Sequence, residues 1–129
     1  MFESNFRMKK HLIISKGTEL LRVPVEHLVY IQADGNYSHV VTRNGRKALV
    51  SFQLGQIEDI IEEQLGEGGD SFLRIGRGLI INSAFIYQID IAKQHLVLSD
   101  GDACFHELTA SKEVLAKLKV WIETDTKTD

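Results

Sequence analysis

The sequence predicts a mainly β fold with two helices, in the α+β class, and three observations support this prediction. Short β-branched and aromatic runs alternate with turn-forming pairs along most of the chain. One segment in the middle and another near the end instead repeat their apolar residues at helical spacing. With 129 residues, of which 43% are hydrophobic, the chain can bury one core. We therefore expect a single domain over residues 11–123, between a flexible segment 1–10 and a polar tail 124–129.

The first half of the chain contains five runs that predict strands. Lys16-Gly17 predicts a tight connection, and Asp34-Gly35-Asn36 has the residue types of a turn. Asn44-Gly45 is the preferred pair of a type I′ hairpin loop. The predicted strands are residues 11–15, 19–23, 28–33, 37–43 and 46–51.

Two segments predict amphipathic helices, at about 53–65 and about 110–123. The first ends at Gly66 and lies in an acidic region, because residues 53–70 carry six Asp or Glu and no Lys or Arg. Each segment places its apolar residues on one face of a helix. These residues are Leu54, Ile57, Ile61 and Leu65 in the first segment, and Val114, Leu115, Leu118, Trp121 and Ile122 in the second.

The stretch 72–86 lies between the two predicted helices and combines an apolar run with Arg74, Arg77 and Asn82. Most of its apolar residues predict core positions. The three polar side chains must either satisfy buried backbone groups or face a partner, and we expect them to project from the sheet. Further strands are predicted at 86–91 and 94–99, then at 103–105 after the turn pair Asp100-Gly101.

Composition restricts the classes of function. Cys104 is the only cysteine, which excludes an intrachain disulfide and zinc sites built on several cysteines. We expect a cytoplasmic protein without a membrane partner, since no run approaches the length of a signal core or a membrane span. The net charge of −3 is not that of a typical nucleic-acid binder. Residues 1–52, however, carry eight Lys or Arg against four Asp or Glu, so positive charge is concentrated outside the acidic helix.

Enzymatic motifs are missing from the sequence. There is no Walker-type phosphate loop, no His-Glu-x-x-His and no nucleophile elbow. The five histidines are scattered without the spacing of metal ligands. We therefore expect no enzyme activity, cofactor or metal, and an enzyme or small-ligand binder that uses His39 or Cys104 is the weakest alternative.

Several polar residues at predicted loop edges instead suit DNA recognition. Arginine can bind guanine through two hydrogen bonds, asparagine can bind adenine, and small hydroxyls can bind phosphates or bases. The residues of this class are Asn36, Ser38, His39, Arg43, Arg74, Arg77 and Asn82.

The run Leu28-Val-Tyr-Ile-Gln-Ala-Asp-Gly-Asn-Tyr-Ser-His39, the helix after it, and Phe72-Leu-Arg-Ile-Gly-Arg-Gly-Leu-Ile-Ile-Asn82 before Ile86 resemble the LytTR family of bacterial DNA-binding domains. The resemblance covers about residues 11–122, in the family's order. It implies an elongated β-rich fold that inserts loops, not a recognition helix, into DNA. The loop with Asn36, Ser38 and His39 would enter a major groove, Arg74, Arg77 and Asn82 would contact DNA nearby, and the residues that open the last helix would reach the next groove.

This sequence departs from the family pattern at several positions. Gly76 and Gly78 stand where the family usually has His and Ser, and Gln32 replaces a common Glu. The start of the last helix lacks the family's Ser-Arg-Arg type of run, so the second groove contact would depend on Thr109, Ser111 and Lys112.

The resemblance implies a transcriptional regulator that binds a repeated site on double-stranded DNA as a homodimer or a side-by-side pair. We expect it to be stand-alone, because the ten residues before His11 hold no receiver domain or membrane segment. A regulatory protein partner would then bring its signal. The alternative from another class is a protein-interaction module on the same fold with weak or lost DNA binding, which the negative net charge favours.

Overall fold

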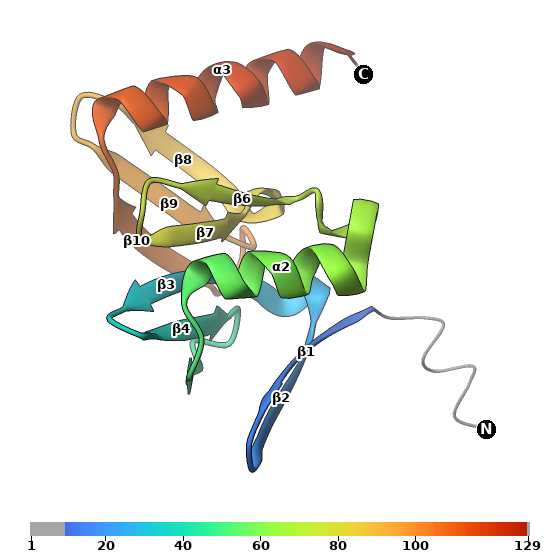
Figure 1. Cartoon of the computed structure of the whole chain (residues 1–129). Coiled ribbons are helices and arrows are strands. Elements are labelled where there is room, and N and C mark those ends of the chain that lie inside the picture. Colours follow the sequence, from blue (N-terminus) through green and yellow to red (C-terminus); the bar gives the residue numbers. More distant parts are fainter. Residues whose placement is uncertain (1–9, 129) are drawn as a thin grey trace. The chain divides into compact units, whose positions relative to one another are not determined.

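The computed structural model describes residues 10–128, with side chains described to residue 124 (Figure 1). The chain divides into two compact units, one ending at Ser83 and the other beginning at Ala84, and the range 11–123 spans both. Within the described residues, strands predominate and there are two α-helices, which confirms the predicted fold class. The predicted segment 1–10 lies outside the described residues except for Lys10, and the side chains of most of the tail 124–129 are likewise not described.

The first unit contains a two-stranded sheet, a five-stranded sheet and one α-helix. The order in the larger sheet is β5-β4-β3-β7-β6, with antiparallel neighbours throughout. The elements are β1 (His11–Lys16), β2 (Glu19–Pro24), η1 (Val25–His27), β3 (Leu28–Asp34), β4 (Tyr37–Thr42), β5 (Lys47–Val50), α2 (Leu54–Leu65), η2 (Gly66–Gly69), β6 (Phe72–Ile75) and β7 (Leu79–Asn82).

Helix α2 packs on one face of the five-stranded sheet. Its Leu54, Ile57 and Ile61 are buried, as the helical period predicts. They join one hydrophobic cluster with Ile31 of β3 and Ile80 of β7. Burying a side chain of this size contributes about 1.5–3 kcal/mol, so this cluster fixes the helix on the sheet.

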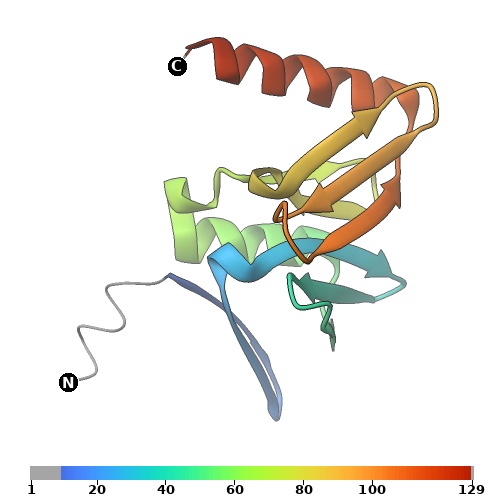
Figure 2. The same ribbon diagram turned by 180° about the vertical axis from the view of Figure 1, so that it is seen from behind.

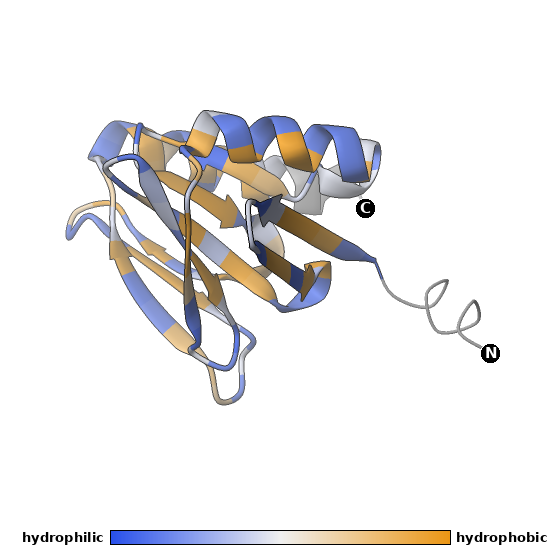
Figure 3. Cartoon of the chain, turned by 60° about the horizontal axis from the view of Figure 1, so that its bottom comes forward, coloured by the Kyte–Doolittle hydropathy of each residue, from blue (hydrophilic) through white to orange (hydrophobic). Residues whose placement is uncertain are grey.

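The second unit is a three-stranded antiparallel sheet with the order β10-β9-β8, followed by a helix. Figure 2 shows the three strands side by side in yellow to orange, with α3 in red. Figure 3 shows blue and orange bands along α2 of the first unit, the helix in front in that view, as expected for an amphipathic helix. The elements are β8 (Ile86–Asp90), β9 (His95–Ser99), β10 (Phe105–Thr109) and α3 (Lys112–Thr128), and η3 (Ser83–Phe85) precedes them.

The predicted strand 103–105 is wrong, because the strand after Asp100-Gly101 is Phe105–Thr109. The side chain of Asp100 accepts hydrogen bonds from the backbone N–H groups of Asp102 (2.9 Å) and Cys104 (3.1 Å). These bonds hold residues 100–104 as a loop, so pairing resumes only at Phe105, opposite Ser99. The last helix begins at Lys112, two residues after the predicted start at about 110.

The same loop predicts a pH dependence of stability. The N–H groups of Asp102 and Cys104 lower the pKa of the Asp100 carboxyl below its ordinary value. The pKa of an aspartate in the unfolded chain is about 3.9. Because the pKa of Asp100 is lower in the folded state, its ionised form stabilises the fold above that pH, and this stabilisation is lost as the pH falls through the folded-state pKa. We expect Asp100→Asn to lower Tm at pH 7, and the difference from wild type to shrink below about pH 4.

Thermal unfolding followed by circular dichroism at pH 7 and pH 3 tests this prediction. Asp102→Asn is the matched control, since it removes a carboxylate from the same loop. If Asp100→Asn lowered Tm by the same amount at both pH values, the stabilising role assigned to the ionised Asp100 carboxylate would be contradicted.

No helix within residues 10–128 is long and apolar enough to cross a membrane.

Candidate nucleic-acid interface

The β3–β4 hairpin ends in a two-residue loop, Gly35-Asn36. Asp34 and Tyr37 are the last paired residues, and Gly35 has a φ of 64°. Glycine at the first central position suits a type II′ turn, whose twist matches the flanking strands. The loop places Asn36 and Tyr37 at the tip of the hairpin with exposed side chains. The candidate Asn36 therefore lies at this end of the sheet.

A second turn lies against the end of β3. The N–H of Ala33 donates to the carbonyl of Gly78 at 2.9 Å, which ties the β6–β7 turn to the β3–β4 hairpin. Gly76 has a φ of 63° in this turn, a conformation that glycine adopts without strain. Arg77 lies between the two glycines and is exposed. The structure therefore brings Arg77 and Asn36 to the same end of the five-stranded sheet.

Arg74 holds this turn in place. Its guanidinium forms an ion pair with Glu58 of α2 and donates to the carbonyl of Arg77 at 3.0 Å. Because the Arg74 guanidinium already binds these two partners, it is less available to a ligand than the guanidinium of Arg77. Both arginines are exposed, and the geometry separates them by contacts: the guanidinium of Arg74 supports the turn, whereas that of Arg77 makes no such contact among residues 10–124.

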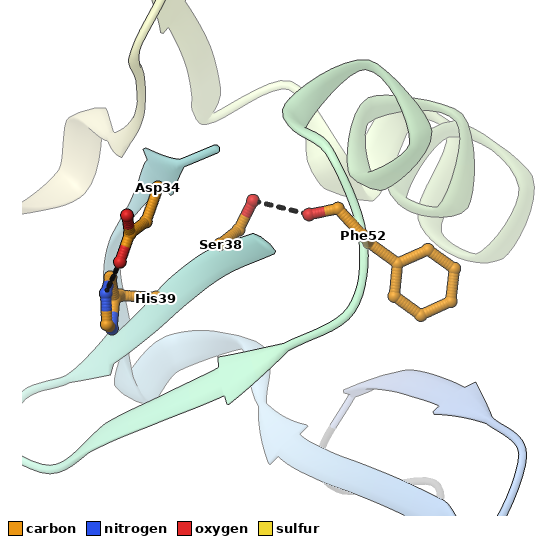
Figure 4. Close-up of polar contacts among 4 residues, drawn as sticks. All are labelled: Asp34, Ser38, His39 and Phe52. Carbon is orange, nitrogen blue, oxygen red and sulfur yellow. Dashed lines mark hydrogen bonds and ion pairs between the residues drawn. The ribbon is translucent and has the colours of Figure 1, made fainter. Parts of the chain in front are cut away.

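Asp34 and His39 lie on the opposite face of the hairpin from Ser38 (Figure 4). The Nε2 atom of His39 lies 2.9 Å from a carboxylate oxygen of Asp34, and the His39 side chain is 34% exposed. His39 is thus oriented by a neighbour while its ring remains accessible. A nearby carboxylate also reduces the positive potential that the hairpin offers to phosphates.

Ser38 is fully buried, and its hydroxyl donates to the carbonyl of Phe52 at 2.7 Å (Figure 4). The segment that contains Phe52 leads into α2. The bond therefore fixes the start of α2 to β4, a structural contact that the sequence does not predict.

Asn82 does not project from the sheet, so that prediction is wrong. Its side chain is 3% exposed, and its Nδ2 donates to the carbonyl of Leu28 at 2.8 Å. The β3–β7 pairing runs only from Gln32–Leu79 to Tyr30–Ile81, and β3 has an irregularity between Leu28 and Tyr30. The Asn82 side chain satisfies a carbonyl beyond the end of this ladder, as a buried polar group must.

The second unit carries the other three predicted contact residues. Thr109 ends β10, Ser111 precedes α3, and Lys112 begins it, and all three are exposed. The Ser111 hydroxyl accepts the N–H of Val114 at 3.2 Å, which is the interaction of an N-cap. The backbone groups of Ala110 bond to Gln94 of the β8–β9 turn. The three predicted residues thus form a group at one end of this sheet.

Sequence reasoning missed Gln53, whose Nε2 donates to Oδ1 of Asn36 at 2.9 Å. A polar residue just before a helix predicts a cap, and nothing local indicates a contact 17 residues away. Two concave surfaces of the first unit, one beside β5 and one between α2 and β6, are lined by other residues than His39. Within the described part of the chain, no group of three or more His, Cys, Asp or Glu is placed to hold a metal ion.

The sequence profile of the LytTr DNA-binding domain matches residues 18–123, whereas a search of curated proteins gave no match. The fold is similar to the LytTr DNA-binding domain of a protein from Bacillus cereus described as a methyl-accepting/DNA response regulator. The TM-score is 0.61, and the identity is 17% over 88% of this chain and 97% of that one. Since the profile covers most of the sequence, the chain belongs to the LytTR family of DNA-binding domains.

Proposed function

We propose that this chain is a transcriptional regulator that binds double-stranded DNA in a sequence-specific manner through loops between strands. The observation that carries the proposal is the pairing of the two turns that present Asn36 and Arg77, joined by the Ala33–Gly78 hydrogen bond. An amide and a guanidinium at one sheet end match the hydrogen-bonding groups of base edges in a major groove.

We assign different roles to the predicted residues. Arg77, Asn36 and His39 contact DNA from the first unit, with Arg77 as the main cation. Thr109, Ser111 and Lys112 contact the backbone from the second unit, because hydroxyls and a lysine suit phosphate oxygens.

The remaining three predicted residues hold other parts of the interface in position and do not contact DNA themselves. Arg74 holds the turn that carries Arg77, Ser38 anchors the start of α2, and Asn82 closes the irregular end of β3. Their contribution to DNA affinity acts through the position of other groups.

The regulatory role is proposed by analogy with the response regulator named for the similar solved structure. A repeated DNA site, with two chains bound side by side or as a homodimer, would let each chain contribute one such interface. A protein with this role acts where bacterial DNA is, in the cytoplasm, and a partner protein is one route by which it receives its signal.

Selection from a pool of duplexes with a randomised centre tests the proposal. We expect the full chain to enrich a defined sequence at 50 mM salt. Affinity for the enriched duplex should fall with a slope steeper than about −2 in log K against log salt, because each neutralised phosphate contributes about −0.9. Failure to enrich any sequence at 50 mM salt would overturn the proposal.

A second candidate function is that of a protein-interaction module that pairs with another regulator. The groove between α2 and β6 favours it, because Glu62 and Asp70 line that groove in addition to the ion-paired Glu58 and Arg74. Such a surface suits a basic partner. This candidate predicts no enrichment in the selection, whereas the DNA-binding function predicts a single enriched motif.

A further inference from the structure

We infer that Gln53 determines which atom of the Asn36 side chain faces DNA, so that Asn36 acts there as a hydrogen-bond donor. The inference rests on the proposed function of the hairpin. It adds a positioning residue outside the hairpin and names the DNA groups that the hairpin can accept.

The orientation begins at the helix start, where Gln53 is the N-cap of α2. Gln53 and Gln56 form a capping box, in which each side chain faces the backbone N–H of the other. The N–H of Gln53 donates to Oε1 of Gln56 at 2.8 Å. Only an amide oxygen is favourable opposite a backbone N–H, so Gln53 turns its own Oε1 toward Gln56. Its Nε2 is therefore directed away from the helix.

The Nε2 group of Gln53 can only donate, and its partner is Oδ1 of Asn36, at 2.9 Å. The Asn36 amide is therefore fixed with its oxygen toward the helix and its Nδ2 available to a ligand. No other hydrogen bond to the Asn36 side chain is present among residues 10–128. Both side chains are exposed, so a ligand can reach this amide.

A fixed Nδ2 donor selects acceptor groups on DNA. Phosphate oxygens, guanine N7 and O6, adenine N7 and thymine O4 all qualify. The usual two-bond contact of asparagine with adenine also needs Oδ1 as an acceptor of the adenine amino group, and here Oδ1 is engaged by Gln53. Asn36 therefore favours a guanine edge, a thymine or a phosphate over a contact with adenine through two hydrogen bonds.

Gln53→Glu tests the inference with little change in shape. The carboxylate still offers an oxygen to the N–H of Gln56, but it presents a second oxygen to Asn36. Asn36 must then rotate to donate with Nδ2, and its Oδ1 would face the DNA acceptors. We expect the Kd for the enriched duplex to rise about tenfold or more, because a lost hydrogen bond is replaced by two facing acceptors.

Gln56→Glu is the matched control, since it makes the same charge change one turn into the helix and keeps the acceptor for the N–H of Gln53. We expect it to raise Kd less than about threefold. In the Asn36→Ala background, the effect of Gln53→Glu should fall to that of Gln56→Glu. In the free protein, Gln53→Glu should move the Asn36 side-chain amide protons downfield in a ¹H–¹⁵N spectrum, because Nδ2 then donates.

The outcomes separate the inference from the proposed function. If the wild type binds its duplex and Gln53→Glu weakens binding no more than Gln56→Glu, the inference is overturned and the DNA-binding function stands. If the wild type enriches no duplex, both are overturned. An excess effect of Gln53→Glu that disappears in the Asn36→Ala background supports both.

Discussion

Asn82→Ala is expected to destabilise the first unit by about 1–3 kcal/mol, the cost of leaving a buried hydrogen-bonding group without its partner. The side chain is almost fully buried and donates to the carbonyl of Leu28. This carbonyl lies beyond the last β3–β7 pair, Tyr30–Ile81, so no backbone donor of β7 takes over when the amide is removed. A loss of this size lowers Tm by several degrees in a chain of this length.

Urea unfolding followed by far-ultraviolet circular dichroism measures the change. Asn82→Asp provides a second variant, because its carboxylate oxygen would face the carbonyl of Leu28 and it cannot donate when ionised. We expect the order of stability to be wild type, then Asn82→Ala, then Asn82→Asp at pH 7. Unchanged unfolding of Asn82→Ala together with a loss of DNA affinity would show instead that Asn82 contacts DNA directly.

The turns and helices that depend only on neighbouring residues could be predicted from the sequence. Asn44-Gly45 predicts the connection between β4 and β5, but the loop runs over residues 43–46 and only Gly45 has a positive φ, so it is not the predicted type I′ pair. The helical period of residues 53–65 predicts α2 to within one residue at its start. Turn residues and amphipathic periods act over a few positions, so one sequence is enough to find them. The position of the strand after Asp100 does not follow from the sequence, because a side-chain bond to Cys104 lengthens the loop beyond the two residues that Asp100-Gly101 predicts.

The candidate interface was harder to predict, because its polar residues depend on distant partners. Asn82 in an apolar run is equally consistent with a projecting contact and a satisfied buried amide, and its partner Leu28 is 54 residues away. Arg74 and Arg77 look equivalent in the sequence. Both are exposed, and only the packing of α2 brings Glu58 to Arg74 and not to Arg77.

Arg77→Ala is expected to cause the largest loss of DNA affinity of any single substitution in the first unit. A good arginine contact to a base edge contributes about 1–3 kcal/mol, which is roughly a 5- to 150-fold change in Kd. Arg77 is exposed on a turn fixed by Gly78 and by Arg74, so its backbone requires little ordering when DNA binds. Fluorescence anisotropy with the enriched duplex measures this loss.

Arg46→Ala is the matched control for charge. Arg46 is also an exposed arginine of the first unit, but it lies on the turn between β4 and β5, at the end of β4 away from Asn36. The two variants have the same net charge, so a nonspecific charge effect lowers affinity equally in both. We expect Arg46→Ala to change Kd less than about threefold, and equal losses in the two variants would contradict the assignment of Arg77.

Arg77→Lys then separates base reading from phosphate binding. Lysine keeps the charge but loses the planar fork that binds guanine through two hydrogen bonds. If Arg77 contacts a phosphate, the lysine variant should bind nearly as well as wild type, and the salt slope of Arg77→Ala should fall by about one. If Arg77 reads guanine, Arg77→Lys should lose affinity for the enriched duplex and discriminate less between bases at one position. Because Asn36 lies at the same sheet end with its donor fixed outward by Gln53, we expect the second result, with the relaxed position next to the one that Asn36→Ala relaxes.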